Sequence, residues 1–443
     1  MKLYAPCEKA FNRVSTPFEH FLHAQTTTGI ILMFMTILAL ILANTPLTDT
    51  YTHFFHIKVD LNVGSWTISN SIHHWINDGL MAIFFFIVGL EIKREILVGE
   101  LSSVKDAMLP ILAAIGGMIL PALIYLSFNY ETQGAQGWGI PMATDIAFAI
   151  SALVLLGNRV SPALVTFLVA LAIVDDLGAV IVIAVFYTET IEMLPLILAG
   201  VSFLILVAFN RFGIRAILPY FLVGLSMWFF MLESGVHATI AGVIAAFAIP
   251  SKPRYTPVDF TAHTKNLFDE FDSYPVATDH MMHESQKAIL LNVRDKIEAI
   301  GSPAARLEHD LHLPVSLIVI PLFALANAGI SIDFSSIGST ILEPVSLGII
   351  AGLVLGKVLG IAGVSYIAIK LGIARLPEDS TMSQIFGVAF LGGIGFTMSI
   401  FVADLAFLGN DALIFQAKVG ILVASLFSGL FGYFWLKKVA NKV

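Results

Sequence analysis

Two adjacent aspartates, Asp175 and Asp176, lie in the middle of an otherwise apolar stretch, ALVTFLVALAIVDDLGAVIVIAVFY at residues 163–187. About 20 apolar residues suffice for a helix that crosses a bilayer, so this stretch predicts a membrane span. A carboxylate at bilayer depth is costly, and ionisable groups placed there mark ion or proton pathways. Because neighbouring carboxylates bind both hard cations and protons, the pair is a candidate site for a cation and a proton.

A lysine, Lys357, lies near the centre of a second apolar stretch at residues 345–369. From there its side chain cannot snorkel to either membrane surface, so we expect its ammonium to face protein or water and to pair with an acid. Glycines recur every four residues on the same stretch, at Gly348, Gly352, Gly356 and Gly360. Such a stripe is typical of a helix face that another helix approaches closely.

Two further apolar stretches are interrupted near their middles. In residues 139–156 a glycine and a proline precede Thr144 and Asp145, and residues 383–406 contain a Gly-Gly-Ile-Gly run. Broken helices at membrane depth line a cavity or are buried in protein, and a pair of them in two halves of a transporter points to its binding site. If the two cross, facing helix N-termini call for an anion and facing C-termini for a cation, which Asp145 and Lys357 can supply. The alternative for Asp145 is the ordinary N-cap of a short helix.

The composition indicates a polytopic membrane protein. Of 443 residues, 57% are hydrophobic and 13% are charged, whereas soluble domains have about 25% charged residues. The single cysteine excludes an internal disulfide framework, no nucleic-acid-binding motif is found, and the chemistry calls for no cofactor. Residues 1–28 are polar, so we expect a cytoplasmic N-terminal segment without a cleaved signal peptide, followed by one transmembrane transporter domain over residues 29–443.

The apolar runs predict an all-α fold of about twelve transmembrane helices. They lie near residues 29–46, 75–99, 107–128, 139–156, 162–187, 193–209, 213–230, 236–250, 314–331, 345–370, 383–406 and 413–436. With the N-terminus inside, all but three of the 24 lysines and arginines fall in cytoplasmic segments, the exceptions being Lys58, Lys357 and Lys418. This asymmetry predicts that both termini are cytoplasmic.

Two connections are long. Residues 47–74, predicted outside, contain FFHIKVDLNVGSWTI, whose alternation and Asn-Val-Gly turn predict a small hairpin. Residues 251–313, predicted inside, have helical periodicity over 284–300. We expect this second loop to form a solvated cytoplasmic appendage.

Several polar residues lie at the predicted ends of spans. Glu91, Arg94 and Glu95 in GLEIKREIL have the spacing of solvated ion pairs on one helix. His237 lies near an outer end, where a hydrogen-bonded structural histidine is the simplest interpretation. Glu308, His309 and His312 begin a cytoplasmic helix boundary. A His-x-x-His spacing could bind a metal, but two ligands fall short of a site, so solvation is the favoured interpretation.

Seven segments, in order along the chain, resemble the NhaA family of sodium/proton antiporters. They are GLEIKREIL at 89–97, ATDIAFA at 143–149, ALAIVDDLGAV at 170–180, SGVHATIAGV at 234–243, LEHDLH at 307–312, PLFALANAGI at 321–330 and GGIGFTMSIF at 392–401. The resemblance covers nearly the whole chain. The loop at 251–313 is longer than in the best-known members of the family.

The resemblance implies inverted repeats with two interrupted, crossing helices in a bacterial cytoplasmic (inner) membrane. It implies that Asp175 and Asp176 bind the transported Na⁺ or Li⁺ and H⁺, with Thr144, Asp145 and Lys357 lining the site and balancing its dipoles. It further implies electrogenic, pH-regulated exchange of one Na⁺ for two H⁺, and a homodimer formed through the external loop 47–74. Its candidate pH-sensing residues are Glu91, Arg94, Glu95, His237, Glu308 and His309.

The residues alone also suggest how exchange arises, because sodium and protons compete for the same carboxylates. A secondary transporter, not an enzyme, is therefore expected. A sodium-coupled symporter or a cation channel is the alternative, although a channel more naturally uses rings of acids in an oligomer. An intramembrane aspartyl protease fits less well, because Asp175 and Asp176 point about 100° apart on one helix instead of facing each other.

Overall fold

A computed structural model of the chain describes residues 25–63, 66–188, 191–255, 257–274, 283–331 and 337–439. Within these ranges the chain is mostly helical, with one two-stranded antiparallel sheet. In the described residues, seven helices are long and apolar enough to cross a membrane, or up to nine if each of two bent pairs is one span. The protein is therefore an all-α polytopic membrane protein.

The seven long spans overlap the predicted apolar runs, although the helix of the run predicted at 314–331 begins at Pro303, within the segment predicted as a loop. They are α6 (Val104–Asn129), a 3-10 segment with α7 (Gln133–Val154), α8 (Pro162–Phe186), α9 (Met193–Arg211), α14 to α15 (Pro303–Asn327), α17 to α18 (Pro344–Lys370) and α21 (Asp411–Val439). One bent pair is α19 (Met382–Leu391) with α20 (Phe396–Ala406), at 49°, and the other is α2 (Gln25–Ala43) with α3 (Thr48–His56), at 112°.

The remaining predicted spans are shorter helices. They are α5 (Met81–Leu97), which continues from α4 (Ile72–His74) and a π-helical segment (Trp75–Leu80), α10 (Ile217–Glu233) and α11 (Thr239–Ala248). At 1.5 Å per residue, the 10 residues of α11 extend about 15 Å, so this helix by itself is too short to cross a bilayer.

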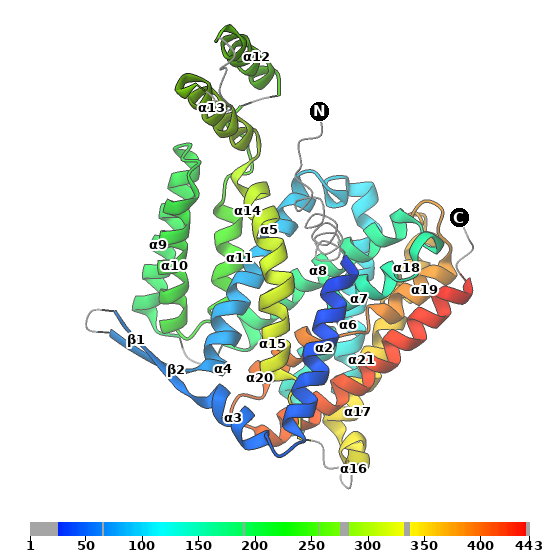
Figure 1. Cartoon of the computed structure of the whole chain (residues 1–443). Helices are drawn as coiled ribbons and strands as arrows, with labels where there is room; N and C mark the ends of the chain where they lie inside the picture. Colours follow the sequence, from blue (N-terminus) through cyan, green and yellow to red (C-terminus); the bar gives the residue numbers. More distant parts are fainter. Residues whose placement is uncertain are drawn as a thin grey trace, which may run out of the picture.

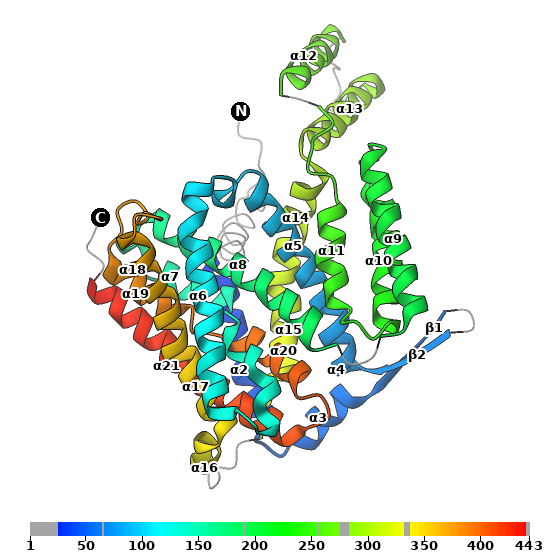
Figure 2. The same cartoon turned by 180° about the vertical axis from the view of Figure 1, so that it is seen from behind.

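Two appendages mark opposite ends of the helical bundle (Figure 1). Strands β1 (Lys58–Val63) and β2 (Trp66–Ser71) pair in register Lys58↔Ser71 within the segment where a hairpin was predicted. Helices α12 (Pro257–Ser273) and α13 (Glu284–Ile300) project from the other side of the molecule, also when it is seen from behind (Figure 2). We name these sides the hairpin end and the appendage end. The short α16 (Ile337–Leu342) lies at the hairpin end.

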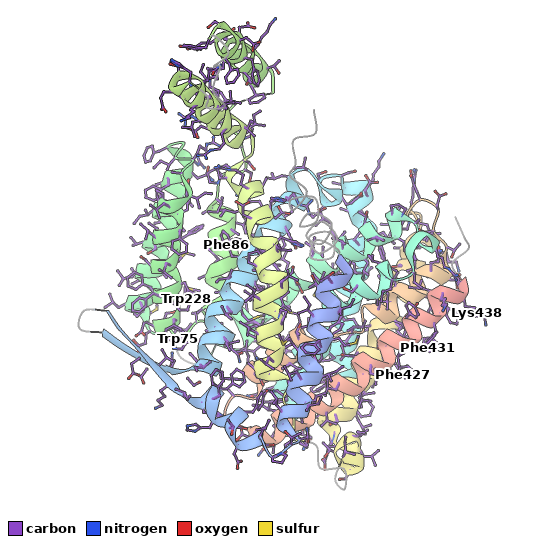
Figure 3. The ribbon with its side chains drawn as sticks, viewed as in Figure 1. Trp75, Phe86, Trp228, Phe427, Phe431 and Lys438 are labelled. Carbon is purple, nitrogen blue, oxygen red and sulfur yellow. The ribbon has the colours of Figure 1, made fainter. Side chains whose placement is uncertain are left out.

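Aromatic side chains gather at the hairpin end of α5 and α10. The rings of Trp75 and Trp228 lie 6.2 Å apart there, and the indole of Trp228 donates a hydrogen bond to the carbonyl of Asp78 (Figure 3). Tryptophans favour the membrane–water boundary. Two lysines, Lys437 and Lys438, lie in the last turn of α21.

The glycine stripe brings the Lys357 helix against α6. A Cβ on Gly360 would overlap the carbonyl oxygen of Gly116, and one on Gly356 would overlap Pro121. Only glycine permits this approach, as the sequence predicted. Two π-helical segments, Gly352–Gly356 and Leu359–Gly363, flank Lys357 on this helix, a feature that the sequence did not indicate.

Candidate cation site at the crossing of two interrupted helices

The two interrupted spans meet at their breaks. The amide of Asp145 donates a hydrogen bond of 2.6 Å to the carbonyl of Ile394, and the hydroxyl of Thr144 lies 2.9 Å from the carbonyl oxygen of Gly392. A Cβ on Gly393 would overlap the backbone of Leu353, so the glycine run lets the chain pass here. The breaks lie where the sequence predicted them, and the helix termini they create converge on one point.

One carboxylate caps two helix N-termini at this crossing. Asp145 accepts from the amide of Phe148 (3.1 Å) in α7 and from the amide of Thr397 (3.0 Å) in α20, and the Thr397 hydroxyl donates to it as well. Asp145 is 2% exposed. Asp145 is therefore the N-cap of α7, and its carboxyl group also lies against the N-terminus of α20.

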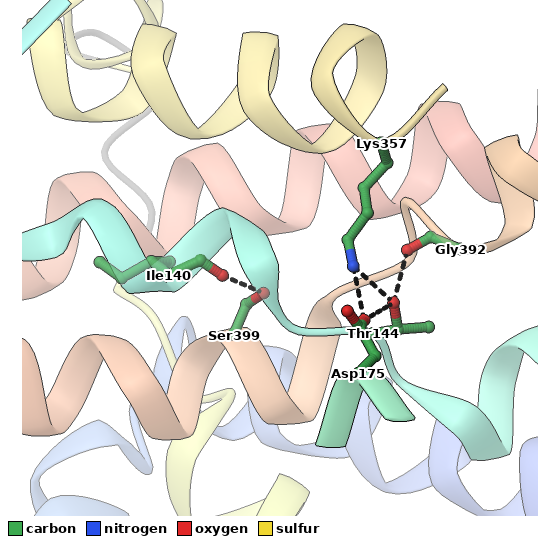
Figure 4. A network of polar contacts seen from close by, with 6 residues as sticks. All are labelled: Ile140, Thr144, Asp175, Lys357, Gly392 and Ser399. Carbon is green, nitrogen blue, oxygen red and sulfur yellow. Dashed lines mark hydrogen bonds and ion pairs between the residues drawn. The ribbon is translucent and has the colours of Figure 1, made fainter. Parts of the chain in front are cut away.

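Lys357 is bonded to one member of the aspartate pair (Figure 4). Its ammonium lies 2.5 Å from Oδ2 of Asp175 and 3.0 Å from the hydroxyl of Thr144, which itself lies 2.6 Å from the same carboxylate oxygen. All three side chains are buried. A second bond across the crossing, from the hydroxyl of Ser399 to the carbonyl of Ile140 (2.9 Å), ties α20 to the 3-10 segment.

Asp176 has a different environment from its neighbour. Consecutive residues of a helix point about 100° apart, and Asp176, unlike Asp175, lines a cavity of about 290 Å³. Neither of its carboxylate oxygens accepts a hydrogen bond from the described part of the chain, and neither does Oδ1 of Asp175. The crossing thus presents three buried carboxylate oxygens that are free to bind a proton or a hard cation.

The cavity reaches from the crossing toward the appendage end. Its lining includes Asp145, Asp176 and Thr397 at depth and Glu91, Arg94, Glu308 and His312 farther out. The side chains of Arg94 and His312 are 49% and 62% exposed, so the lining continues to the surface. An ion can therefore approach Asp176 from the appendage end.

The structure brings four of the predicted pH-sensing residues together at this mouth. Arg94 pairs with Glu308 (2.9 Å) and with Glu95 (3.2 Å), and Glu91 lies beside them. His309 is exposed and is not part of the cavity lining. His312, which was not among the predicted site residues, instead lies 3.9 Å from Glu91.

His237 lies apart from that cluster. Its Nε2 is 2.8 Å from the carbonyl oxygen of Tyr187, at the other end of α8 from the cavity mouth. The hydroxyl of Tyr187 in turn contacts the amide of Gly139 and the carbonyl of Gln136. His237 therefore connects α8 and α11 with the first interrupted span near the hairpin end.

Sequence reasoning missed Thr397 and His312 as site residues. Thr397 begins the helix after the Gly-Gly-Ile-Gly run, a position that faces the crossing once the run is read as a break. His312 lies four residues after Glu308, on the same helix face. In both cases the spacing relative to a residue already singled out was the available signal.

Comparison with known proteins gives one consistent family. The model of the family described as Na⁺/H⁺ antiporter 1 matches residues 19–436. A Na⁺/H⁺ antiporter NhaA of Sulfurimonas denitrificans is 72% identical over 441 residues, covering 100% of this chain and 99% of the relative. Na⁺/H⁺ antiporter NhaA 1 of Saccharophagus degradans is 49% identical, over 98% and 94% of the two chains. The NhaA of Dichelobacter nodosus is 48% identical, over the same shares.

Proposed function

Because the chain belongs to the NhaA family of Na⁺/H⁺ antiporters, we propose that it exchanges internal Na⁺, or Li⁺, for external H⁺ at Asp175 and Asp176. The observation that carries this assignment is the unequal pair. Asp176 offers two unbonded oxygens to a cavity, while Asp175 is held by Lys357 and Thr144. Thr144, Asp145 and Lys357 line the site and balance the helix ends around it.

Exchange follows from competition for these oxygens. Sodium is a hard cation that binds carboxylate, hydroxyl and carbonyl oxygens, and the same carboxylates bind protons as a coupled pair. When Na⁺ occupies the site, Lys357 can leave Asp175 so that both carboxylates contact the ion. If two protons replace one Na⁺, each cycle moves one net positive charge inward, which makes the exchange electrogenic.

The proposed setting is a bacterial inner membrane crossed by twelve spans in the inverted repeats of the NhaA fold. The shorter helices α5, α10 and α11 then complete the count. Lys93 and Arg94 at the end of α5, with Lys437 and Lys438 at the end of α21, support a cytoplasmic appendage end. The hairpin end is then external and both termini are cytoplasmic.

The direct test is sodium-dependent proton movement in everted membrane vesicles. An acid interior is established and reported by a quenched pH dye, and added Na⁺ or Li⁺ should then restore the fluorescence. A sodium-coupled symporter would carry its co-transported solute in the same direction as sodium, so added Na⁺ would not release protons and the dye would stay quenched. A channel would pass sodium without a coupled release of protons from the acid interior.

Raising sodium should move the activation of exchange to lower pH. Protons hold Asp175 and Asp176 in acid, so Na⁺ must outcompete them there. By mass action, a tenfold rise in Na⁺ should lower the midpoint by about one pH unit if one proton competes, and by about half a unit if two do. The measurement is exchange against cytoplasmic pH at several sodium concentrations in reconstituted vesicles.

A separate pH sensor predicts a different outcome in the same experiment. If the charged groups at the cavity mouth or His237 set the activation pH, the midpoint will not depend on sodium. Glu308→Gln would then move the midpoint even at saturating Na⁺, because it removes the partner of Arg94. A sodium-independent midpoint in the unmodified protein would overturn the competition model.

We further propose that the protein forms a homodimer through the external loop 47–74. The amide of Ile72 donates to the carbonyl of Ile57 (3.0 Å), so the two sides of the hairpin base are adjacent. Replacing residues 58–70 with two glycines would remove the strands and keep Ser71, which caps α4. Exchange should persist while the protein shifts toward monomer in detergent, measured by light scattering. An unchanged dimer would place the interface elsewhere.

A further inference from the structure

A second ion pair, largely but not fully buried, lies away from the aspartate site. Asp404 on α20 and Lys418 on α21 approach to 3.2 Å, and their side chains are only 12% and 14% exposed. The remaining oxygen of Asp404, Oδ2, is buried and accepts no hydrogen bond from the described residues. An ionisable pair inside membrane spans is costly and calls for a functional explanation.

Helix α15 packs against α20 and against the π-helical segment Trp75–Leu80, and polar residues bond to one another where α15 meets that segment. His73 lies 2.9 Å from Oδ1 of Asn327, and the amides of Asn327 and Asn77 bond to each other at 2.8 and 3.3 Å. We name His73, Asn77, Asn327, Asp404 and Lys418 the outer cluster.

A thin apolar layer separates the outer cluster from the cavity below it. Phe85, Phe323 and Phe401 are each 1% exposed, and the ring of Phe401 lies 5.7 Å from that of Phe85 and 6.0 Å from that of Phe323. Phe323 also lines the cavity that holds Asp176. Asn327 follows Phe323 by four residues and Asp404 follows Phe401 by three, so the layer is about one helical turn thick.

Helix α20 connects the two polar regions along one face. Thr397, Phe401 and Asp404 are spaced i, i+4, i+7, which places them on the same side of the helix. Thr397 bonds to Asp145 at the crossing, and Phe401 belongs to the apolar layer. Asp404 is therefore the ionisable residue on this face of α20, beyond the layer in the direction of the hairpin end.

We propose that Asp404 is an external access site that binds the exchanged monovalent cations, Na⁺ or H⁺, before and after they pass Phe401. Lys418 acts there as a tethered cation that occupies Asp404 while the cavity is open toward the appendage end. This arrangement repeats the relation of Lys357 to Asp175. The inference rests on the proposed function and adds to it the route taken on the external side.

The test compares the sodium dependence of exchange from the two sides of the membrane. Right-side-out vesicles expose the hairpin end and everted vesicles expose the appendage end. At alkaline pH, Asp404→Asn should raise the half-saturating Na⁺ about tenfold in right-side-out vesicles, because an attracting charge is lost. The value in everted vesicles should change less than twofold. Lys418→Gln should lower the external value, because the competing ammonium is gone.

Two further variants separate this role from a structural one. Asp411→Asn makes the same change at an exposed acid of α21 and should alter neither value. The double variant Asp404→Asn with Lys418→Gln leaves no unpaired charge and should regain the stability lost by Asp404→Asn alone, while the external half-saturation stays raised. Normal external half-saturation in the double variant, or equal shifts on both sides, would overturn the proposal. Absence of exchange in the unmodified protein would instead refute the proposed function.

Discussion

Asp176→Asn should abolish sodium-dependent proton movement in everted vesicles. The amide keeps the shape of the side chain but removes the charge that attracts Na⁺ and the group that carries the proton. Both oxygens of Asp176 are free of hydrogen bonds from the described chain, and of the aspartate pair it is Asp176 that lines the cavity. The measurement is the recovery of a quenched pH dye on addition of Na⁺.

The same substitution at the two neighbours should have different effects on stability. Asp176→Asn removes a buried, unpaired charge and should leave the free energy of unfolding unchanged or raise it. Asp175→Asn leaves the ammonium of Lys357 without its carboxylate partner, and breaking a buried pair in this way costs about 3–5 kcal/mol. Thermal unfolding in detergent should therefore separate two variants that both lose transport.

A matched control is Asp106→Asn, which changes an exposed acid in the first turn of α6. It should exchange sodium normally and unfold at the temperature of the unmodified protein. Normal exchange by both Asp175→Asn and Asp176→Asn would disprove the site. Equal destabilisation by both would show that the pair does not divide its contacts as described.

The main parts of the site were visible in the sequence because each breaks an apolar pattern. Asp175, Asp176 and Lys357 are charges within long apolar runs, and such charges must be explained wherever they occur. The two breaks were visible for a similar reason, since glycine and proline interrupt a helix locally. Local rules therefore sufficed to single out these residues, and the structure brings them to one crossing.

The different contacts of Asp175 and Asp176 could not be predicted in this way. It depends on which carboxylate meets Lys357, a contact between residues 182 positions apart. The bond between Asp145 and Thr397 joins residues 252 positions apart. Helical spacing gives the relative direction of neighbouring side chains but not what each one faces. Contacts of this range arise from the packing of several helices, and no local pattern encodes them.

The contacts at the mouth of the cavity also could not be predicted from local sequence patterns. His309 and His312 are three residues apart on one helix, and either could have been the residue that faces Glu91. The orientation of α14 relative to α5 determines which histidine faces Glu91, and the structure places His312 there. Likewise Lys418 was recognised as a charge within the last span, but its partner Asp404 became evident only when α20 and α21 were seen to pack together.

Lys357→Ala should reduce both stability and transport. It leaves the buried carboxylate of Asp175 without a counter-charge, and an unpaired charge is unfavourable in a buried site. Oδ2 of Asp175 would keep only the hydroxyl of Thr144, and the loss of a buried partner is worth about 3–5 kcal/mol. The effect should shrink as the pH falls, because a protonated Asp175 no longer needs a counter-charge. Thermal unfolding in detergent at several pH values measures this directly.

The comparison variants make that loss specific to the pair. Lys370→Ala changes an exposed lysine at the end of the same helical span and should leave the unfolding temperature unchanged. Lys357→Ala combined with Asp175→Asn removes both charges, so its destabilisation should be much smaller than the sum of the two single effects. If the two losses simply add, Lys357 does not stabilise the protein through Asp175. An unchanged unfolding temperature in Lys357→Ala would mean that its ammonium is solvated, and the competition between Lys357 and sodium for Asp175 would then have no basis.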